Sequence, residues 1–145
     1  MRPFTPEVAG TLAPQTAPIA VGGRSLRMDL EGARVLETGP GVETSHPVAH
    51  VLGGKNVIYF LTPFPRGRLQ VLPIAFDARR KEWYDTTASM VRHFRSEPDA
   101  PIDWKNRALT FEASCYGCHG SQLATNYDLK TDSYHTVWSE PGINC

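Results

Sequence analysis

Alternating apolar and polar positions run through the first half of the chain and predict short β-strands. Runs rich in Val, Ile, Leu, Tyr and Phe are expected as strands over Ser25–Leu30, Ala33–Thr38, Val48–Leu52, Asn56–Leu61, Leu69–Phe76 and Glu82–Tyr84. Turn residues separate the runs, and Gly53-Gly54 predicts a tight hairpin because glycine readily adopts positive φ. Residues 19–85 are therefore expected to form an antiparallel β meander.

The pattern becomes helical after Tyr84. Apolar residues recur there at spacings of three and four, which would place them on one face of a helix: Thr87, Met90, Val91 and Phe94. Shorter helical pieces are expected over 109–114 and 136–139. Residues 1–18 carry four prolines among small and polar residues, which is typical of an extended lead-in.

These patterns predict an α+β fold with little regular structure. A small antiparallel β meander would be followed by a helical and loop segment over residues 86–145. The fifteen basic and fifteen acidic side chains cancel, so net charge does not point to nucleic acid. No apolar run is long enough for a transmembrane helix.

The motif Cys115-Tyr116-Gly117-Cys118-His119 carries the chemistry of the segment 86–145. C-x-x-C-H is the attachment sequence of c-type haem. Two thiols at this spacing add to the vinyl groups of the porphyrin, and the adjacent histidine gives the iron its proximal ligand. The motif therefore predicts haem c, with Cys115 and Cys118 as thioether anchors and His119 as an axial ligand of the iron.

Two other interpretations of the cysteines stay open. Cys115, Cys118 and Cys145 with one histidine could make a four-ligand zinc site. A Cys-x-x-Cys pair can also be a redox-active dithiol, which usually follows a strand in a βαβ unit. Neither alternative requires a histidine directly after the second cysteine, so the motif favours haem.

The sixth ligand of the iron would decide what such a site can do. A second histidine gives a low-potential carrier, methionine raises the potential, and an open position permits substrate chemistry. His50, on an apolar strand face, and His93, beside the predicted apolar helix face, are the main candidates. His46, before a proline, and His135, in a polar segment, are weaker candidates. The alternative for each is a half-buried histidine that binds no metal.

The stretches after the motif, read in order, resemble bacterial multihaem cytochromes c: Gly120–Leu123, Asn126–Asp128, Thr131–Tyr134, Thr136–Glu140 and Gly142–Cys145. The resemblance is to large exported proteins with a multihaem module, often followed by tetratricopeptide repeats. Upstream, Val48–Leu61, Gly67–Asp77 and Trp83 resemble the β segment that such proteins place before a haem motif. The similarity covers roughly residues 46–145.

The resemblance implies that Cys145 is the first cysteine of a second haem motif, so the chain is expected to be a fragment. The chain departs from the family pattern because it has no earlier C-x-x-C-H and no apolar signal segment in Met1–Gly10. The resemblance also implies a periplasmic or other extracytoplasmic location. Redox partner proteins and further haem modules of the same parent chain are the implied partners.

The expected function is therefore electron transfer by a multihaem c-type cytochrome. In one alternative the chain is part of a multihaem oxidoreductase, whose open iron site acts on a nitrogen or sulfur compound. Another is a structural module stabilised by zinc. Nothing in the sequence singles out a catalytic group next to an open iron, so a carrier is favoured over an enzyme.

Overall fold

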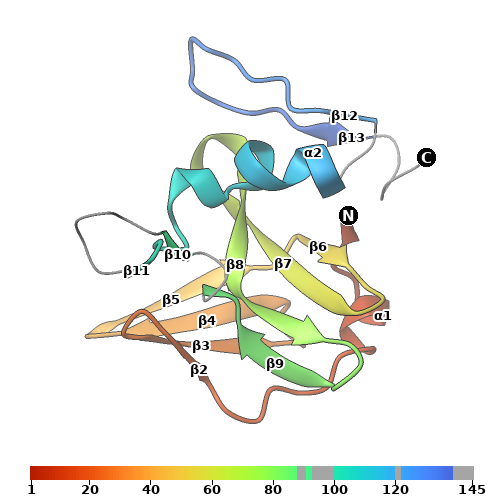
Figure 1. Ribbon diagram of the computed structural model, residues 1–145, viewed down its shortest axis with the longest axis vertical. Coiled ribbons are helices and arrows are strands. Elements are labelled where there is room, and N and C mark those ends of the chain that lie inside the picture. The colour runs from red at the N-terminus through yellow and green to blue at the C-terminus, as the bar shows by residue number, and fades with distance from the viewer. Residues whose placement is uncertain (88–90, 93–99, 120–121, 139–145) are drawn as a thin grey trace.

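Two antiparallel sheets form the main body of the protein in a computed structural model that describes residues 1–87, 91–92, 100–119 and 122–138 (Figure 1). The first sheet has the order β2-β3-β4-β5, with strands Ile19–Val21, Arg24–Asp29, Arg34–Gly39 and Val42–Pro47. The second has the order β1-β6-β7-β8-β9, with strands Arg2–Pro3, His50–Gly53, Val57–Phe64, Arg68–Asp77 and Glu82–Asp85.

Shorter elements complete the described fold. Helix α1 covers Pro6–Ala9, and the 3-10 turns η1 and η3 cover Pro65–Gly67 and Arg107–Leu109. A π-helical turn, η4 (Phe111–Cys115), runs directly into helix α2 (Tyr116–His119). The remaining strands form two-stranded pairs: β10 (Val91–Arg92) with β11 (Ala100–Pro101), and β12 (Leu123–Ala124) with β13 (Val137–Trp138).

The strands predicted from alternation are confirmed. The bounds of β3, β4, β6, β7, β8 and β9 lie within about three residues of the expected runs. The hairpin predicted at Gly53-Gly54 joins β6 to β7, with Gly53 at φ +79°. A side chain at Gly53 would meet the backbone oxygen of Val57 at 2.2 Å, so the turn also requires glycine for space.

The predicted α+β class is wrong, because the part of the chain that the structure describes is mostly β, with 46% strand and 16% helix. Val91 was expected on a helix face but lies in β10, opposite Pro101 of β11. Residues four apart share a face in a strand as well as in a helix, so the short apolar pattern after Tyr84 could not separate the two. Met90, His93 and Phe94 lie outside the described residues.

The second short helix, expected over 136–139, is also replaced by a strand where the structure describes it. Val137 and Trp138 form β13 and pair with Ala124 and Leu123. The helical expectation for 109–114 is confirmed, because η4 begins at Phe111.

Side-chain alternation buries apolar residues on both faces of the five-stranded sheet. The inner face packs against Leu26, Met28 and Val35 of the four-stranded sheet and against Trp104. The buried residues of the five-stranded sheet in this inner core are Val51, Ile58, Phe60, Leu72, Ile74 and Phe76. On the outer face Leu52, Leu61 and Val71 pack with Phe111 of η4. We call this smaller set, with Leu69, Cys115 and Leu123 packed against it, the outer cluster.

The N-terminal residues, expected as an extended lead-in, take part in the fold. Arg2 and Pro3 pair with β6 as strand β1. Thr5 caps helix α1 by accepting a hydrogen bond from the Val8 amide, and Val8 is buried in the inner core. No helix in the described part of the chain has the length and hydrophobicity needed to cross a membrane, as predicted.

Candidate functional site

The cysteine motif lies on one continuous stretch of helical turns. Cys115 ends η4, and Cys118 and His119 belong to α2. Cys118 and His119 follow Cys115 by three and four positions, so each is a neighbour of Cys115 on this stretch. Figure 1 shows α2 at the end of the molecule that also carries the β12–β13 hairpin.

The two thiols have different environments. Cys115 is half-buried against the outer cluster, whereas Cys118 and His119 are exposed. A Cβ at Gly117, between the cysteines, would meet no atom within 4 Å. The motif therefore presents one thiol beside apolar side chains, a second thiol and an imidazole at the surface, and open space between them. This arrangement fits covalent attachment of a large, flat, apolar ring.

A buried carboxylate lies one turn before the first cysteine. Glu112 accepts hydrogen bonds from the Leu69 amide, at 3.1 Å, and from the Thr136 hydroxyl, at 3.3 Å. Burial raises the pKa of Glu112 above its ordinary value. These bonds connect η4 both to β8 and to the hairpin that ends in β13.

The environment of Cys115 argues against a reactive dithiol. Burial, and then the nearby charges of Glu112 and Cys118, raise the pKa of the Cys115 thiol. Nucleophilic cysteines need a lowered pKa, because the thiolate is the reactive form.

His50 begins β6 on the same side of the sheet as the motif. It lies directly across from Leu61 and two residues before Leu52, and both leucines belong to the outer cluster. The sequence predicted that His50 lies on an apolar strand face, shared with its neighbours Val48 and Leu52. The structure confirms the shared face for Leu52, whereas Val48 packs in the inner core. Burial, and then the charge of the N-terminal amine, lower the pKa of His50 below its ordinary value.

The ring of His50 contacts Trp138 of the hairpin edge to face, with 4.9 Å between ring centroids and 84° between ring planes. Its Nδ1 atom is buried and has no hydrogen-bond partner among the described residues. The ring lines a cavity of about 400 Å³ together with Gly67, Leu69, Tyr134, His135, Thr136, Val137 and Trp138. Leu69 lines this cavity and, like Cys115, packs against the outer cluster.

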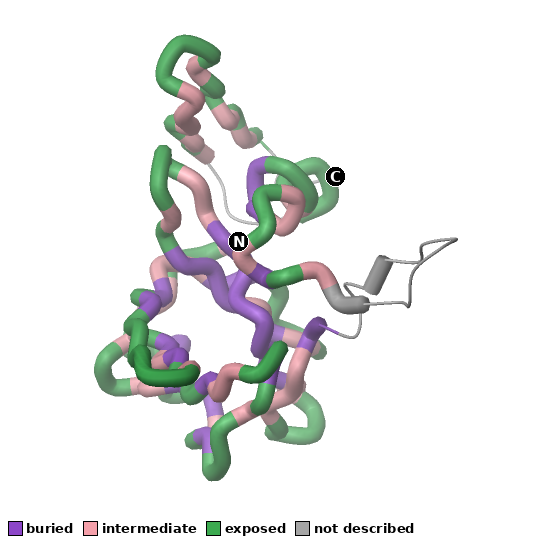
Figure 2. The backbone as a smooth tube through the Cα atoms, turned by 90° about the vertical axis from the view of Figure 1, so that its left-hand side faces the viewer, coloured by how far each residue is buried: buried purple, intermediate pink, exposed green. Residues whose placement is uncertain are grey.

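Asp132 fixes the hairpin over this cavity. Its carboxylate accepts hydrogen bonds from Arg107 at 2.6 Å and from the Tyr127 hydroxyl at 2.7 Å, and it also pairs with Arg66. A Cβ at Gly67 would lie 2.0 Å from the backbone oxygen of Tyr134, so only glycine allows this approach. In Figure 2 the hairpin extends from the body and is exposed along much of its length.

The weaker histidine candidates are engaged elsewhere. His46 is buried, and its Nε2 lies 2.7 Å from the Glu37 carboxylate in the four-stranded sheet. His135 is exposed, and its ring nitrogen lies 3.4 Å from the Ser133 hydroxyl.

The other candidate metal ligands, His93 and Cys145, lie outside the described residues. Within the described part of the chain, no three His, Cys, Asp or Glu side chains are close enough to hold a metal ion.

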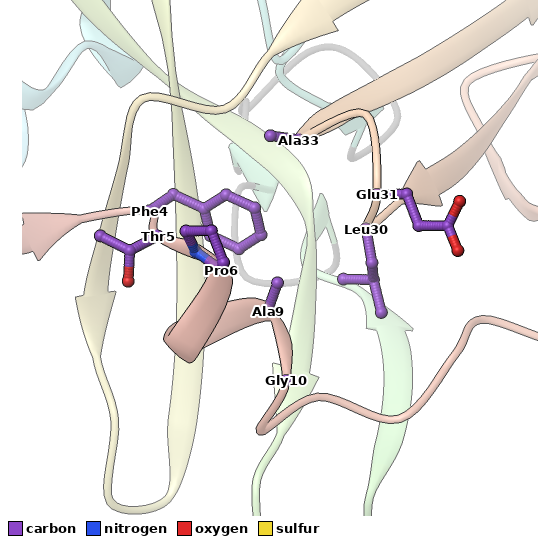
Figure 3. A pocket seen from close by; sticks show the side chains of 8 residues that line it. All are labelled: Phe4, Thr5, Pro6, Ala9, Gly10, Leu30, Glu31 and Ala33. Carbon is purple, nitrogen blue, oxygen red and sulfur yellow. The ribbon is translucent and has the colours of Figure 1, made fainter.

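A second cavity, of about 370 Å³, lies away from the motif (Figure 3). It opens between the start of α1 and the β3–β4 turn and is mostly apolar, with lining residues Phe4, Thr5, Pro6, Ala9, Gly10, Leu30, Glu31 and Ala33. No residue that the sequence singled out for chemistry lines it.

Sequence reasoning missed Glu112 and Asp132, and it did not foresee the contact of Trp138 with His50. For Glu112 a signal was present, because it precedes Cys115 by three positions and so shares its helix face. Trp138 and Asp132 act through contacts made only by the folded hairpin.

Comparison of the chain with protein-family models, with curated proteins and with solved structures found no match. The function must therefore be argued from the motif and its surroundings.

Proposed function

We propose that this chain binds haem c covalently and serves in electron transfer as a module of an extracytoplasmic multihaem cytochrome. The observation that supports the proposal is the C-x-x-C-H motif, with Cys115, Cys118 and His119 in one helical segment whose first cysteine packs against the outer cluster of the sheet. When bound, the haem supplies an iron that gains and loses one electron.

The residues of the chain have separate roles in this proposal. Cys115 and Cys118 hold the porphyrin through thioether bonds, and the imidazole of His119 binds the iron. Gly117 leaves the space that the ring needs beside the helix. The outer cluster below Cys115 keeps water away from that side of the ring, and a lower local dielectric strengthens electrostatic control of the potential.

The multihaem part of the proposal comes from the family resemblance. Cys145 would begin the next haem motif, and neighbouring haems of the parent chain would pass electrons to one another and to redox partner proteins. An extracytoplasmic location, such as the periplasm, follows from the same resemblance.

The test is expression with export in a host that matures c-type cytochromes, followed by a pyridine haemochrome assay on the denatured protein. We expect covalent haem in the parent chain and none in the Cys115→Ala/Cys118→Ala double variant. The matched control is Cys145→Ala, which should keep its haem because Cys145 lies outside the attachment motif. A colourless protein that contains zinc, and loses it in Cys145→Ala, would overturn the proposal in favour of a structural zinc site.

A further inference from the structure

Thr62, Gln70 and Trp104 are buried residues that meet on the inner side of the five-stranded sheet. Thr62 of β7 lies directly opposite Gln70 of β8, so the two side chains are cross-strand neighbours. Both belong to the inner face, because Leu61 and Val71, which follow or precede them by one position, pack in the outer cluster. The Gln70 side-chain amide donates a hydrogen bond to the Trp104 carbonyl, which brings the third residue to this pair.

Each of the three side chains has one buried atom without a hydrogen-bond partner among the described residues. These atoms are Thr62 Oγ1, Gln70 Oε1 and Trp104 Nε1. Burying an unpaired polar atom costs free energy, so such an atom calls for an explanation. Because the three atoms belong to neighbouring residues, one shared partner can account for all of them.

Gln70 cannot turn its amide to pair Oε1 differently. Its Nε2 donates to the carbonyl oxygen of Trp104 and, at 3.3 Å, to that of Asn106. A flipped amide would set Oε1 against two carbonyl oxygens, so these partners fix the amide orientation.

The indole ring of Trp104 is also held in place. It contacts the ring of His46 edge to face, with 5.0 Å between ring centroids, and the ring of Phe64, with 5.9 Å between centroids. Phe64 follows Thr62 by two positions on β7 and therefore shares its face of the sheet. The indole thus packs in the region of the inner core that also contains Thr62 and Gln70.

The three unpaired atoms complement one water molecule. The indole N–H only donates, the amide Oε1 only accepts, and the threonine hydroxyl can do either. A water bonded to all three makes three hydrogen bonds, which is typical of buried water. An apolar ligand would leave all three atoms unpaired, and an ion would find no opposite charge on these side chains.

We infer that Thr62, Gln70 and Trp104 bind one buried water molecule, which bridges the five-stranded sheet to the segment that leads into the motif. That segment runs from Trp104 through η3 into η4. The water supplements the two hydrogen bonds that the Gln70 amide makes to this segment, and so helps to hold the motif on the sheet. The inference does not depend on bound haem.

The test is a nuclear Overhauser measurement between water and the indole N–H protons of the ¹⁵N-labelled full chain, with Trp104→Phe to assign the signal. A long-lived buried water transfers magnetisation to a neighbouring N–H, so we expect a strong water cross-peak for Trp104. The matched control is Trp83, whose indole N–H donates directly to the Ala13 carbonyl at 2.8 Å and should show no such cross-peak. A Trp104 signal without a water cross-peak would overturn the inference.

Thr62→Val distinguishes a bound water from the Thr62 hydroxyl, whose proton exchanges with solvent and can produce the same cross-peak. Valine has nearly the shape of threonine, and the water keeps its bonds to Gln70 and Trp104, so the cross-peak should remain. Its loss would show that the signal comes from the hydroxyl and would contradict the inference. Thr110→Val is the control, because the buried Thr110 hydroxyl already donates to the Arg107 carbonyl at 3.0 Å, and it should leave the cross-peak unchanged.

A crystal structure of the parent chain covers the case in which Thr62→Val fails to fold. We expect a water peak within hydrogen-bond distance of Thr62 Oγ1, Gln70 Oε1 and Trp104 Nε1. Direct hydrogen bonds among these three atoms, with no water between them, would disprove the site.

Discussion

At the scale of single residues, environment separates side chains that are equivalent in the sequence. Cys115 and Cys118 are both cysteines of one motif, yet Cys115 packs on apolar side chains while Cys118 is exposed. Glu112 is one of many acidic residues, yet it is buried next to Cys115 and bonded to the Leu69 amide. Its protonation therefore depends on the fold.

Glu112→Gln should change how stability depends on pH. Because burial raises the pKa of Glu112 above 4.5, the folded protein holds the proton more tightly than the unfolded chain. The stability associated with neutral Glu112 is fully present below pH 4.5 and is lost as pH rises through the raised pKa. Glutamine cannot ionise and can still accept from Leu69, so the variant should gain stability relative to the parent over this range.

Urea unfolding between about pH 4 and about pH 8 measures this difference. Glu31→Gln, at an exposed turn, is the control and should follow the parent at every pH. If the free energy of unfolding depended on pH in the same way in the parent and in Glu112→Gln, Glu112 would have the same pKa in the folded and the unfolded chain.

At the scale of elements, the motif segment and the hairpin support each other. Glu112 of η4 accepts a hydrogen bond from Thr136, just before β13. Asp132 connects the other end of the hairpin to Arg66 in η1 and to Arg107 in η3. The hairpin is therefore positioned by contacts at both ends, and through Trp138 it positions His50.

Asp132→Asn should loosen the hairpin without disturbing its backbone. Asp132 has φ +48°, a conformation that asparagine also tolerates. Asparagine keeps a side-chain oxygen but loses the charge that pairs with Arg66 and Arg107. We expect faster amide hydrogen exchange over 122–138, measured by mass spectrometry, and unchanged exchange in the two large sheets.

The contacts of Asp132 also set the pH below which the hairpin loses its protection from hydrogen exchange. Hydrogen bonds from Tyr127 and Arg107 lower the pKa of Asp132 to about 2. Protection of the hairpin should therefore persist below pH 3.8 and decline only as pH falls towards 2. The control, Asp29→Asn, removes a similar aspartate–arginine pair from the β3–β4 turn, and it should leave hairpin exchange unchanged. Equal exchange rates in Asp132→Asn and the parent would rule out this role for Asp132.

At the scale of the whole molecule, a buried ionic cluster ties the segment before the motif to the four-stranded sheet. Glu37 of β4 lies 2.8 Å from Lys105, 2.7 Å from His46 and 3.2 Å from Arg24. Burial opposes its ionisation, but hydrogen bonds from Lys105 and His46 hold the pKa of Glu37 below its ordinary value. The neighbouring Trp104 is buried in the core.

Glu37→Ala should destabilise the whole fold by about 1–3 kcal/mol, because it leaves the buried His46 without its partner and removes the acceptor of Lys105. Global unfolding in urea measures the loss. Glu43→Ala is the matched control on the adjacent strand, because Glu43 is exposed, and it should change stability by less than about 0.5 kcal/mol. Equal losses in the two variants would mean that Glu37 contributes no more than an exposed glutamate.

The sequence by itself determined most β-strands of residues 24–85, although it did not predict β5 (Val42–Pro47). Period-two alternation is local and strong, and glycine at positive φ marks a turn directly. The spacing of Cys115, Cys118 and His119 is likewise a property of a few consecutive residues. The short apolar pattern after Tyr84 misled because spacing by four suits strands and helices equally.

Only the tertiary structure decided what surrounds the motif. The contact of Trp138 with His50 joins residues far apart in the chain, and the carboxylate of Asp132 binds arginines from two other turns. Burial of Glu112 likewise depends on β8 and on the hairpin. Such contacts follow from how sheets and loops pack, and no local pattern of residues encodes them.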